Sequence, residues 1–389
     1  GSVTVKLEDA HTLQQLIDIN NETTGEITLN KADEALSGST AQLKQALDGT
    51  ITGGYQGNIT LNDNLKSRVD VPATDLSFVA GKTSGTITVT NAFNVQGTAT
   101  EVAAAMNEAK FTATKANVNL TDASHTAVEL RDINNATNGT ITIHANKLGE
   151  ALEGSAADLA AAFTGITNYT GALTVKGAAH SLSELITIND ATSGGITLSE
   201  PATVLKGSAA DLSAALDGVI TGTYKGDVNI TNSSGSITAT ILQKIADKTD
   251  GKVVVDNAIG VTGTAADVAK AFTSTGVTAG SVTVKLENAH TLQQLIDINT
   301  ETTGVITLFK ADEALTGNTS QLKAALDGTI TGGYQGDITL GDKDKSSIQA
   351  TDLSFVAGKT AGSINVTEAI NIQGTATEVA AAMNEAKFT

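Results

Sequence analysis

The sequence repeats itself on two length scales, and this constrains the fold more than any other feature. Residues 1–61 recur as 280–340, and residues 74–112 recur as 351–389 after a two-residue deletion. A long repeat of about 279 residues therefore restarts at residue 280, and inside it runs a shorter period of about 56 residues with two similar halves. Such a chain builds one supersecondary unit per repeat and buries its core by stacking neighbouring units.

Each half opens with a short segment that alternates polar and apolar residues, as in Thr86-Ile87-Thr88-Val89. Alternation with β-branched residues predicts a half-buried strand. First-half strands are expected at Val3, Ile59, Val118, Leu173, Val228, Val282 and Ile338. Second-half strands are expected at Ile27, Ile87, Ile141, Ile196, Val253, Ile306 and Ile364. Extended segments at Val95, Leu152, Leu205 and Val261 predict a third, weaker strand per module.

A helix is expected after each strand. Candidate N-caps in the first halves are Thr12, Thr126, Ser181 and Thr291. In the second halves, a hydroxyl residue followed three positions later by an acid predicts a capping box. These pairs are Thr98 with Glu101, Ser155 with Asp158, Ser208 with Asp211, and Thr264 with Asp267. First-half helices are expected to end in turns such as residues 20–25, where Gly25 would take a positive φ.

Strand, helix and parallel strand at intervals of about 28 residues imply right-handed crossovers. We therefore predict an α/β fold, a right-handed solenoid of about 28-residue strand–helix coils with a parallel sheet and short capped helices. One coil buries too few apolar side chains to offset its ordering entropy, so the stack is the folding unit. The array is expected to run continuously over residues 1–389, in modules at 1–57, 58–116, 117–171, 172–226, 227–280, 281–336 and 337–389. Because the first copy continues into Ala113-Thr114-Lys115, we interpret the chain as a segment of a longer array.

The composition fits a thin, layered core and narrows the range of partners. Aromatic residues make up 3% of the chain, and it has no tryptophan or cysteine. The formal charge is −18, and Arg68 and Arg131 are the arginines, so no basic surface for nucleic acid is expected. No apolar run approaches the roughly 20 residues that cross a bilayer, so we expect no membrane span.

Two stretches carry a resemblance to a known class of protein. They are residues 130–143, LRDINNATNGTITI, and residues 152–159, LEGSAADL. They resemble giant tandem-repeat cell-surface proteins of bacteria, in particular those of marine cyanobacteria of the motility-associated Synechococcus type. The likeness covers essentially the whole chain, although its motifs are low in complexity. It implies export, an extracellular or cell-surface location and a structural role, and it brings no catalytic residues.

The candidate chemical groups follow the repeat. His11, His125, His180 and His290 each stand just before a first-half helix, which favours a structural role. Catalysis needs a singular constellation of groups, and we found none, so we expect no enzyme and no cofactor. Calcium stays open as a ligand, because the acidic loops 62–64 and 342–344 could supply oxygen atoms.

The most regular predicted surface feature is a row of Thr and Asn on the solvent face of the strands, here called the ladder. Its members are Thr4, Thr28, Thr60, Thr88, Asn119, Thr142, Thr174, Thr197, Asn229, Thr283, Thr307, Thr339 and Asn365, with Val254 as an interruption. Strand propensity alone could explain it. It could also bind ice or polysaccharide, or pack against a neighbouring array.

These observations favour an extracellular structural repeat protein that forms a surface fibre, sheath or layer by stacking and self-association. Its expected partner is a second copy of itself, with polysaccharide as a further candidate. The alternative is an adhesin stalk or a ligand-binding module for polysaccharide, ice or calcium.

Overall fold

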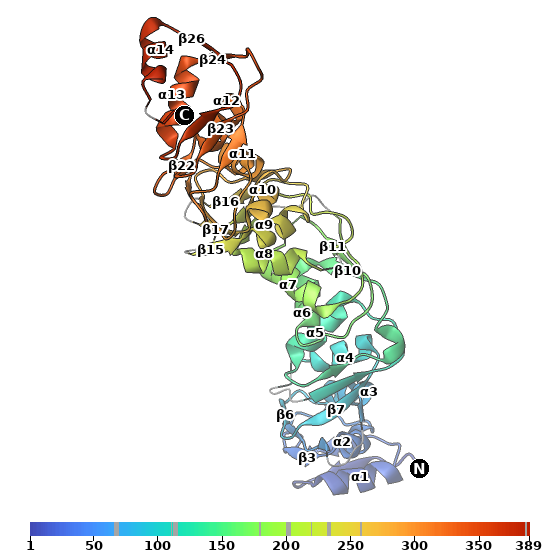
Figure 1. Ribbon diagram of the computed structural model, residues 1–389. Coiled ribbons are helices and arrows are strands. Elements are labelled where there is room, and N and C mark those ends of the chain that lie inside the picture. The colour runs from blue at the N-terminus through green and yellow to red at the C-terminus, as the bar shows by residue number, and fades with distance from the viewer. Residues whose placement is uncertain are drawn as a thin grey trace. The chain divides into compact units, whose positions relative to one another are not determined.

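The computed structural model describes residues 1–65, 70–109, 111, 116–178, 180–199, 204–218, 220–231, 235–256, 259–385 and 387–389. In these residues the protein is α/β, and helices alternate with short strands along the chain (Figure 1). Contacts divide the chain into two compact units: unit 1 is residues 1–180 with 187–200, and unit 2 is residues 181–186 with 201–389. The expected continuation at Ala113-Thr114-Lys115 lies outside the described residues, as does Arg68.

Unit 1 contains six whole helices and four sheets among its described residues. The helices are α1 Leu13–Glu22, α2 Thr40–Leu47, α3 Ala73–Lys82, α4 Ala99–Met106, α5 Ala127–Ala136 and α6 Ala156–Phe163, with the short 3-10 helix η2 Ala145–Lys147. The strands are β1 Val5–Leu7, β2 Ile27–Leu29, β3 Leu36–Gly38, β4 Ile59–Leu61, β5 Val71–Pro72, β6 Ile87–Val89, β7 Phe93–Gly97, β8 Ala116–Leu120, β9 Ile141–Thr142, β10 Leu152–Ser155, β11 Leu173–Lys176 and β12 Ile196–Leu198. Helix α7, Leu182–Ala191, contains the division between the units.

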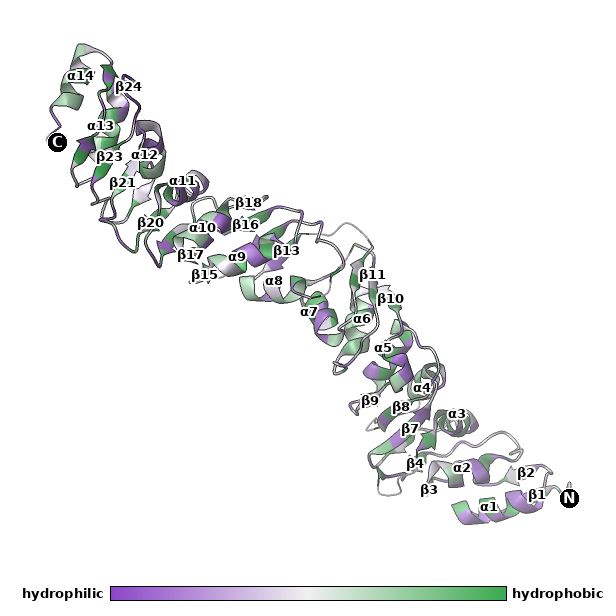
Figure 2. Ribbon diagram, turned by 45° about the vertical axis from the view of Figure 1, so that its right-hand side comes forward, coloured by the Kyte–Doolittle hydropathy of each residue, from purple (hydrophilic) through white to green (hydrophobic). Residues whose placement is uncertain are grey.

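Unit 2 repeats this plan. Its helices are α8 Ala209–Leu216, α9 Ala239–Ala246, α10 Ala265–Phe272, α11 Leu292–Glu301, α12 Thr319–Leu326, α13 Ala350–Lys359 and α14 Ala376–Met383. Its strands are β13 Leu205–Gly207, β14 Val228–Ile230, β15 Ser236–Thr238, β16 Val253–Val255, β17 Gly260–Gly263, β18 Val277–Thr278, β19 Thr283–Leu286, β20 Val305–Thr307, β21 Leu315–Gly317, β22 Thr329–Ile330, β23 Ile338–Leu340, β24 Ser347–Gln349, β25 Ile364–Val366 and β26 Asn371–Gln373. Within each unit, consecutive whole helices pack on one another, and hydrophobic residues recur in every coil (Figure 2).

The predicted strands are confirmed at most positions, including the weaker strand before each second-half helix. The first-half strands at Val3 and Val282 are wrong by two residues, because Val5 pairs with Ile27 and Val284 pairs with Ile306. Residues 3–7 alternate throughout, so alternation alone does not determine which of them face the partner strand.

All strand pairs described are parallel, but they form several small sheets rather than the single sheet expected. A coil places its opening strand in one sheet and the strand before its helix in the next sheet. In unit 1, for example, β4 pairs with β3 and β6, whereas β7 pairs with β5 and β8. Apart from β1-β2, every sheet described therefore starts with a strand that precedes a helix.

The predicted helix caps are present. The hydroxyls of Thr12, Thr126 and Thr291 accept a hydrogen bond from the third helical N–H, and Glu184 N donates to Ser181 Oγ at 3.2 Å. Thr98 and Glu101 form the full reciprocal box. Ser155, Ser208 and Thr264 form a different version, in which the hydroxyl also donates to the aspartate three residues later. The aspartate side chain is one methylene shorter than glutamate, which accounts for its bonding the hydroxyl instead of the more distant cap N–H.

After each first-half helix, a buried threonine bonds to the backbone near the start of the strand that precedes that helix. We call this arrangement the threonine clamp. The hydroxyl donates to a carbonyl oxygen 20 or more residues earlier and accepts from the N–H of a glycine two residues later. For Thr83 the two distances are 2.7 Å to Gly57 O and 2.9 Å to Gly85 N. The clamp threonines are Thr23, Thr83, Thr137, Thr192, Thr249, Thr302 and Thr360.

The expected positive φ at the glycine of this turn is wrong. Gly25 does not adopt it, and helix α1 ends instead at Thr23 in an extended conformation, with φ −132°. Glycine is required there for space: a Cβ on Gly25 would lie 2.3 Å from the carbonyl oxygen of Val3. The same close approach occurs at Gly139, 2.1 Å from Ala116 O. These turns are close backbone contacts between coils.

Candidate functional site

The ladder positions lie on the strands, except Thr4, which precedes β1, and none of them is buried. First-half and second-half members face each other across parallel strand pairs. The pairs are Thr60 with Thr88, Asn119 with Thr142, Thr174 with Thr197, Asn229 with Val254, and Thr339 with Asn365. The predicted outward row is therefore present in the sheets that contain these five pairs.

Two predicted members do not occupy the row position. Thr283 lies opposite Gly260, and Lys285 is the residue opposite Thr307. In the same way, Lys6 and not Thr4 lies opposite Thr28. This follows from the two-residue shift of strands β1 and β19, and it places a lysine in each of these two rows.

The rows also contain residues that the sequence pattern did not predict. They come from the strand before each helix, at the position just before a glycine, and include Ser37, Gln96, Glu153, Lys206 and Thr316. The signal that could have found them is the recurring residue-glycine pair ahead of each capping box. The rows thus mix hydroxyl, amide and charged groups, and they are interrupted wherever one sheet ends.

Some ladder hydroxyls bond to threonine hydroxyls outside the ladder. Thr28 and Thr52 approach to 3.2 Å between their Oγ1 atoms, and Thr307 and Thr331 to 2.9 Å. In another row, Asn119 donates to Asp70 at 3.3 Å. These polar groups already have hydrogen-bond partners within the protein, although the ladder side chains remain exposed or half-exposed to solvent.

The histidines of the first halves sit in a second recurring arrangement. His11, His125 and His290 are buried, and each imidazole contacts the edge of a tyrosine 44 residues later, with ring centres 6.0–6.2 Å apart. Those tyrosines donate their hydroxyls to backbone carbonyls, such as Tyr169 to Glu150 O at 2.6 Å. The histidine therefore packs one coil against another.

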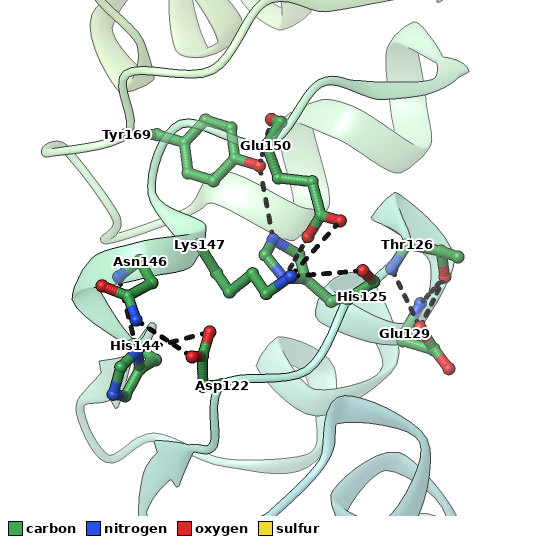
Figure 3. Close-up of polar contacts among 10 residues, drawn as sticks. Asp122, His125, Thr126, Glu129, His144, Asn146, Lys147, Glu150 and Tyr169 are labelled. Atoms are coloured by element: carbon green, nitrogen blue, oxygen red, sulfur yellow. Dashed lines mark hydrogen bonds and ion pairs between the residues drawn. The ribbon is translucent and has the colours of Figure 1, made fainter.

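The group around His125 is the most polar version of this arrangement (Figure 3). Its Nε2 lies 3.3 Å from the Tyr169 hydroxyl, and its Nδ1 lies 3.5 Å from Glu150 Oε2. Lys147 Nζ lies 4.0 Å from the other Glu150 oxygen and 3.4 Å from Ser124 Oγ. Hydrogen bonding from Ser124 is the main cause that lowers the pKa of Glu150.

Burial dominates the ionisation of these rings. It lowers the pKa of His11, His125 and His290, although a nearby glutamate opposes the shift in each case. Burial likewise raises the pKa of Tyr169 above its usual value. A neutral imidazole beside a protonated phenol offers no charged nucleophile at neutral pH, so this geometry supports packing more directly than chemistry.

The lowered histidine pKa values predict a loss of stability in mild acid. Below the usual histidine pKa of 6.5, the unfolded chain takes up a proton that the folded chain resists, so the free energy of unfolding falls. We expect the urea midpoint to decrease between pH 7.5 and pH 5, and His290→Phe to reduce that decrease while keeping a ring against Tyr334. Thr197→Val, which changes an exposed side chain and no titratable group, is the control and should leave the pH dependence unchanged. An equal decrease in His290→Phe and the wild type would contradict this assignment.

The two acidic loops considered for calcium have a structural use. Asp63 accepts hydrogen bonds from the backbone N–H and the hydroxyl of Thr40, at 2.9 and 2.8 Å. Asp342 does the same for Thr319, at 2.9 and 2.7 Å. Each carboxylate thus binds the N-terminus of the helix in the preceding coil, where negative charge is favoured. In the part of the chain that the structure describes, no three or more acidic, histidine or cysteine side chains group as metal ligands do.

Comparison with models of known protein families and with curated proteins gave no match. Among the residues described, none of the helices combines the length and the apolar character needed to cross a membrane.

Proposed function

We propose that this protein is an extracellular structural protein of the cell surface, a right-handed solenoid of paired strand–helix coils that forms a fibre, sheath or layer. The observation that carries the proposal is the threonine clamp, which recurs in all seven first-half coils. A chain that repeats one such bond in every module, at every second coil, has a contact pattern suited to extension, because each module is stabilised by its neighbours.

Two further features support a structural role. The polar groups with the most distinctive environments, the buried histidines and the acidic loops, are repeated elements that join coils. The formal charge of −18 would keep long assemblies soluble. The resemblance to giant bacterial surface repeats points to the same role and to an extracellular location.

The ladder supports contacts with other copies more than recognition of a regular surface. Ice or a crystalline polysaccharide presents a flat lattice, whereas these rows mix Thr and Asn with Lys, Glu and Gln and are interrupted between sheets. Mixed donors and acceptors suit hydrogen bonding to a second protein array.

Electron microscopy of the purified chain and of the native cell surface tests the proposal. We expect filaments or sheets whose mass per length corresponds to stacked coils. Compact single particles at all concentrations would contradict it. Binding of Ca²⁺ or of a glycan, measured by calorimetry in the absence of any assembly, would favour the adhesin alternative instead.

A further inference from the structure

One strand of unit 2 departs from the repeat. Val305, the first residue of β20, stands where the first copy of the long repeat has Glu26. Phe309, two residues after the end of β20, stands where that copy has Asn30. Both replacements make the surface less polar. A feature of the repeat as such would be the same in both copies, so these two residues indicate a property specific to the second copy.

Both apolar side chains are exposed to solvent. Val305 is 40% exposed and Phe309 is 65% exposed. Strand β20 pairs with β19 on one side and with β22 on the other, so the exposure does not arise at an edge of the sheet. Among the residues described, Phe309 is the one aromatic side chain in the exposed class. An aromatic ring left in water beside another exposed apolar residue indicates a binding surface.

A groove lies on the same sheet, which has the strand order β15-β17-β19-β20-β22 (β15, β17 and β20 in Figure 2). Its volume is about 410 Å³, within the range of sites that hold small ligands. Val305 and Thr307 of β20 line it, together with Gly260 of β17 and Lys285 of β19. Phe309 follows Thr307 by two residues, which is about 7 Å along an extended chain. The exposed ring therefore lies close to the groove.

The groove depends on Gly260, which has no side chain. In the sheet β5-β7-β8-β9 of unit 1, the equivalent position is Asn94, which pairs with Asn117 as Gly260 pairs with Thr283. There the side chain of Asn117 donates a hydrogen bond of 3.3 Å to that of Asn94, so amide groups occupy the place of the groove. A Cβ on Gly260 would already lie 3.2 Å from Thr283 Oγ1 and 3.4 Å from Ser236 Cβ. The groove is thus a second departure from the repeat on the same sheet.

The polar side chains of the groove are available to a ligand. Ser236, Thr262 and Thr283 contribute hydroxyls to its lining, and within the described part of the chain these hydroxyls have no hydrogen-bond partner. Lys285 forms no ion pair with a described residue, whereas the equivalent Lys6 lies 3.7 Å from a glutamate. The groove therefore offers hydroxyl donors and acceptors beside one unpaired positive charge.

The face around the groove is small. Its five strands are two to four residues long, which corresponds to roughly 250 Å² at the usual strand spacing. A stable contact between two proteins buries about 800 Å² on each partner. A narrow groove with hydroxyls, one cation and one exposed ring therefore fits a thin polar chain better than a second folded copy.

We propose that this groove and Phe309 bind a single chain of an acidic polysaccharide, one built from carboxylated sugars. The groove hydroxyls exchange hydrogen bonds with sugar hydroxyls, and Lys285 pairs with a sugar carboxylate. The C–H face of a sugar packs on the ring of Phe309, because those hydrogens carry partial positive charge and the ring face is negative. Valine in place of Glu26 removes a negative charge that would repel the same ligand. The inference goes beyond the structural role, because it gives one sheet of the array a ligand of its own.

Calorimetry on the whole chain tests the ligand class. The probe is an alginate hexasaccharide, whose sugars all carry carboxylates, and the comparison is maltohexaose, which is neutral. We expect the alginate fragment to bind at least about tenfold more tightly, and its affinity to fall as salt is raised. Lys285→Gln is expected to bind the two probes with similar affinity, because the charge that separates them is gone.

Variants that restore residues of the first copy test the apolar part of the site. Phe309→Asn and Val305→Glu each introduce a residue that the repeat already carries at the equivalent position, so circular dichroism should stay unchanged. Phe309→Asn is expected to weaken binding of the alginate fragment at least about fivefold, because the stacking surface is lost. Val305→Glu is expected to weaken it through charge repulsion, and less so at high salt.

A further variant fills the groove. Gly260→Asn introduces the residue that unit 1 carries as Asn94 and is expected to abolish binding. The matched control is Thr339→Asn, in the sheet β21-β23-β25 of the same unit. It changes a half-exposed ladder residue to the one that β14 carries as Asn229, and it should bind like the wild type.

The outcomes separate this site from the structural role. No binding of the alginate fragment to the wild type, or wild-type binding by both Phe309→Asn and Gly260→Asn, would overturn the inference. Self-association that Phe309→Asn abolishes, without any glycan binding, would overturn it too and assign the surface to a second copy. Filaments without glycan binding would leave the structural role standing alone, and glycan binding without filaments would leave only this site.

Discussion

Gly139→Ala is expected to lower the free energy of unfolding of unit 1 by about 3 kcal/mol, because the added methyl group would overlap backbone atoms. Its Cβ would lie 2.1 Å from the carbonyl oxygen and 2.6 Å from the carbonyl carbon of Ala116. Both atoms belong to the backbone of Ala116, the first residue of strand β8, so no movement of a side chain could relieve the contact. We expect the urea midpoint of circular dichroism to fall clearly, because the coils must separate to accommodate the methyl group.

Gly81→Ala is the matched control in the same unit. Gly81 lies in helix α3, and an added Cβ there would meet no atom within 4 Å. Alanine in a helix interior is favoured over glycine by about 0.5–1 kcal/mol, so this variant should be slightly more stable than the wild type. If both substitutions changed the midpoint in the same direction, the close approach at Gly139 would not be the cause.

Thr83→Val is expected to lower the free energy of unfolding by about 2 kcal/mol. Valine has nearly the same shape, but it leaves the Gly57 carbonyl and the Gly85 N–H without the hydroxyl that joins them at 2.7 and 2.9 Å. A buried polar group that loses its partner costs about 1–3 kcal/mol. Amide hydrogen exchange should locate the effect, with faster exchange at Gly85.

Two variants control this experiment. Thr83→Ser keeps the hydroxyl and should retain most of the stability. Thr197→Val removes an exposed ladder hydroxyl from strand β12, at a position where strand β16 naturally carries Val254, and should change the stability by less than about 0.5 kcal/mol. A loss as large in Thr197→Val as in Thr83→Val would show that the clamp has no special role.

Much of the local structure could be predicted because it depends on neighbours in sequence. Alternation over four residues located β6 at Ile87, and Thr98 with Glu101 located the start of α4. The short strand β24 before α13 and its equivalents β5 and β15 were missed. They are two or three residues long and lie directly against a helix, so they show too little alternation to be recognised.

Part of the candidate site could be predicted for the same reason. The ladder residues of β4 and β6 were found because a threonine between two apolar residues must face away from them. The lysine at position 6 was missed, because Thr4 and Lys6 both fit the alternation and only the pairing with strand β2 places Lys6 opposite Thr28. The sequence thus predicted which residues of most strands face solvent, but it did not predict which residue of the adjacent strand lies opposite each of them.

The sequence by itself determined the order of strands and helices and the helix caps, because alternation, amphipathicity and capping act over a few adjacent residues. The uniform step of about 28 residues is wrong for the strands, because paired strands lie between 21 and 28 residues apart in the sequence. Only the tertiary structure decided the strand register, the division into small sheets and the reason for the clamp glycines. Those features depend on atoms more than 20 residues apart, such as Gly25 against Val3 O. Where two backbone segments pack closely, only glycine fits, and the residues next to a glycine in sequence do not show which distant segment it contacts.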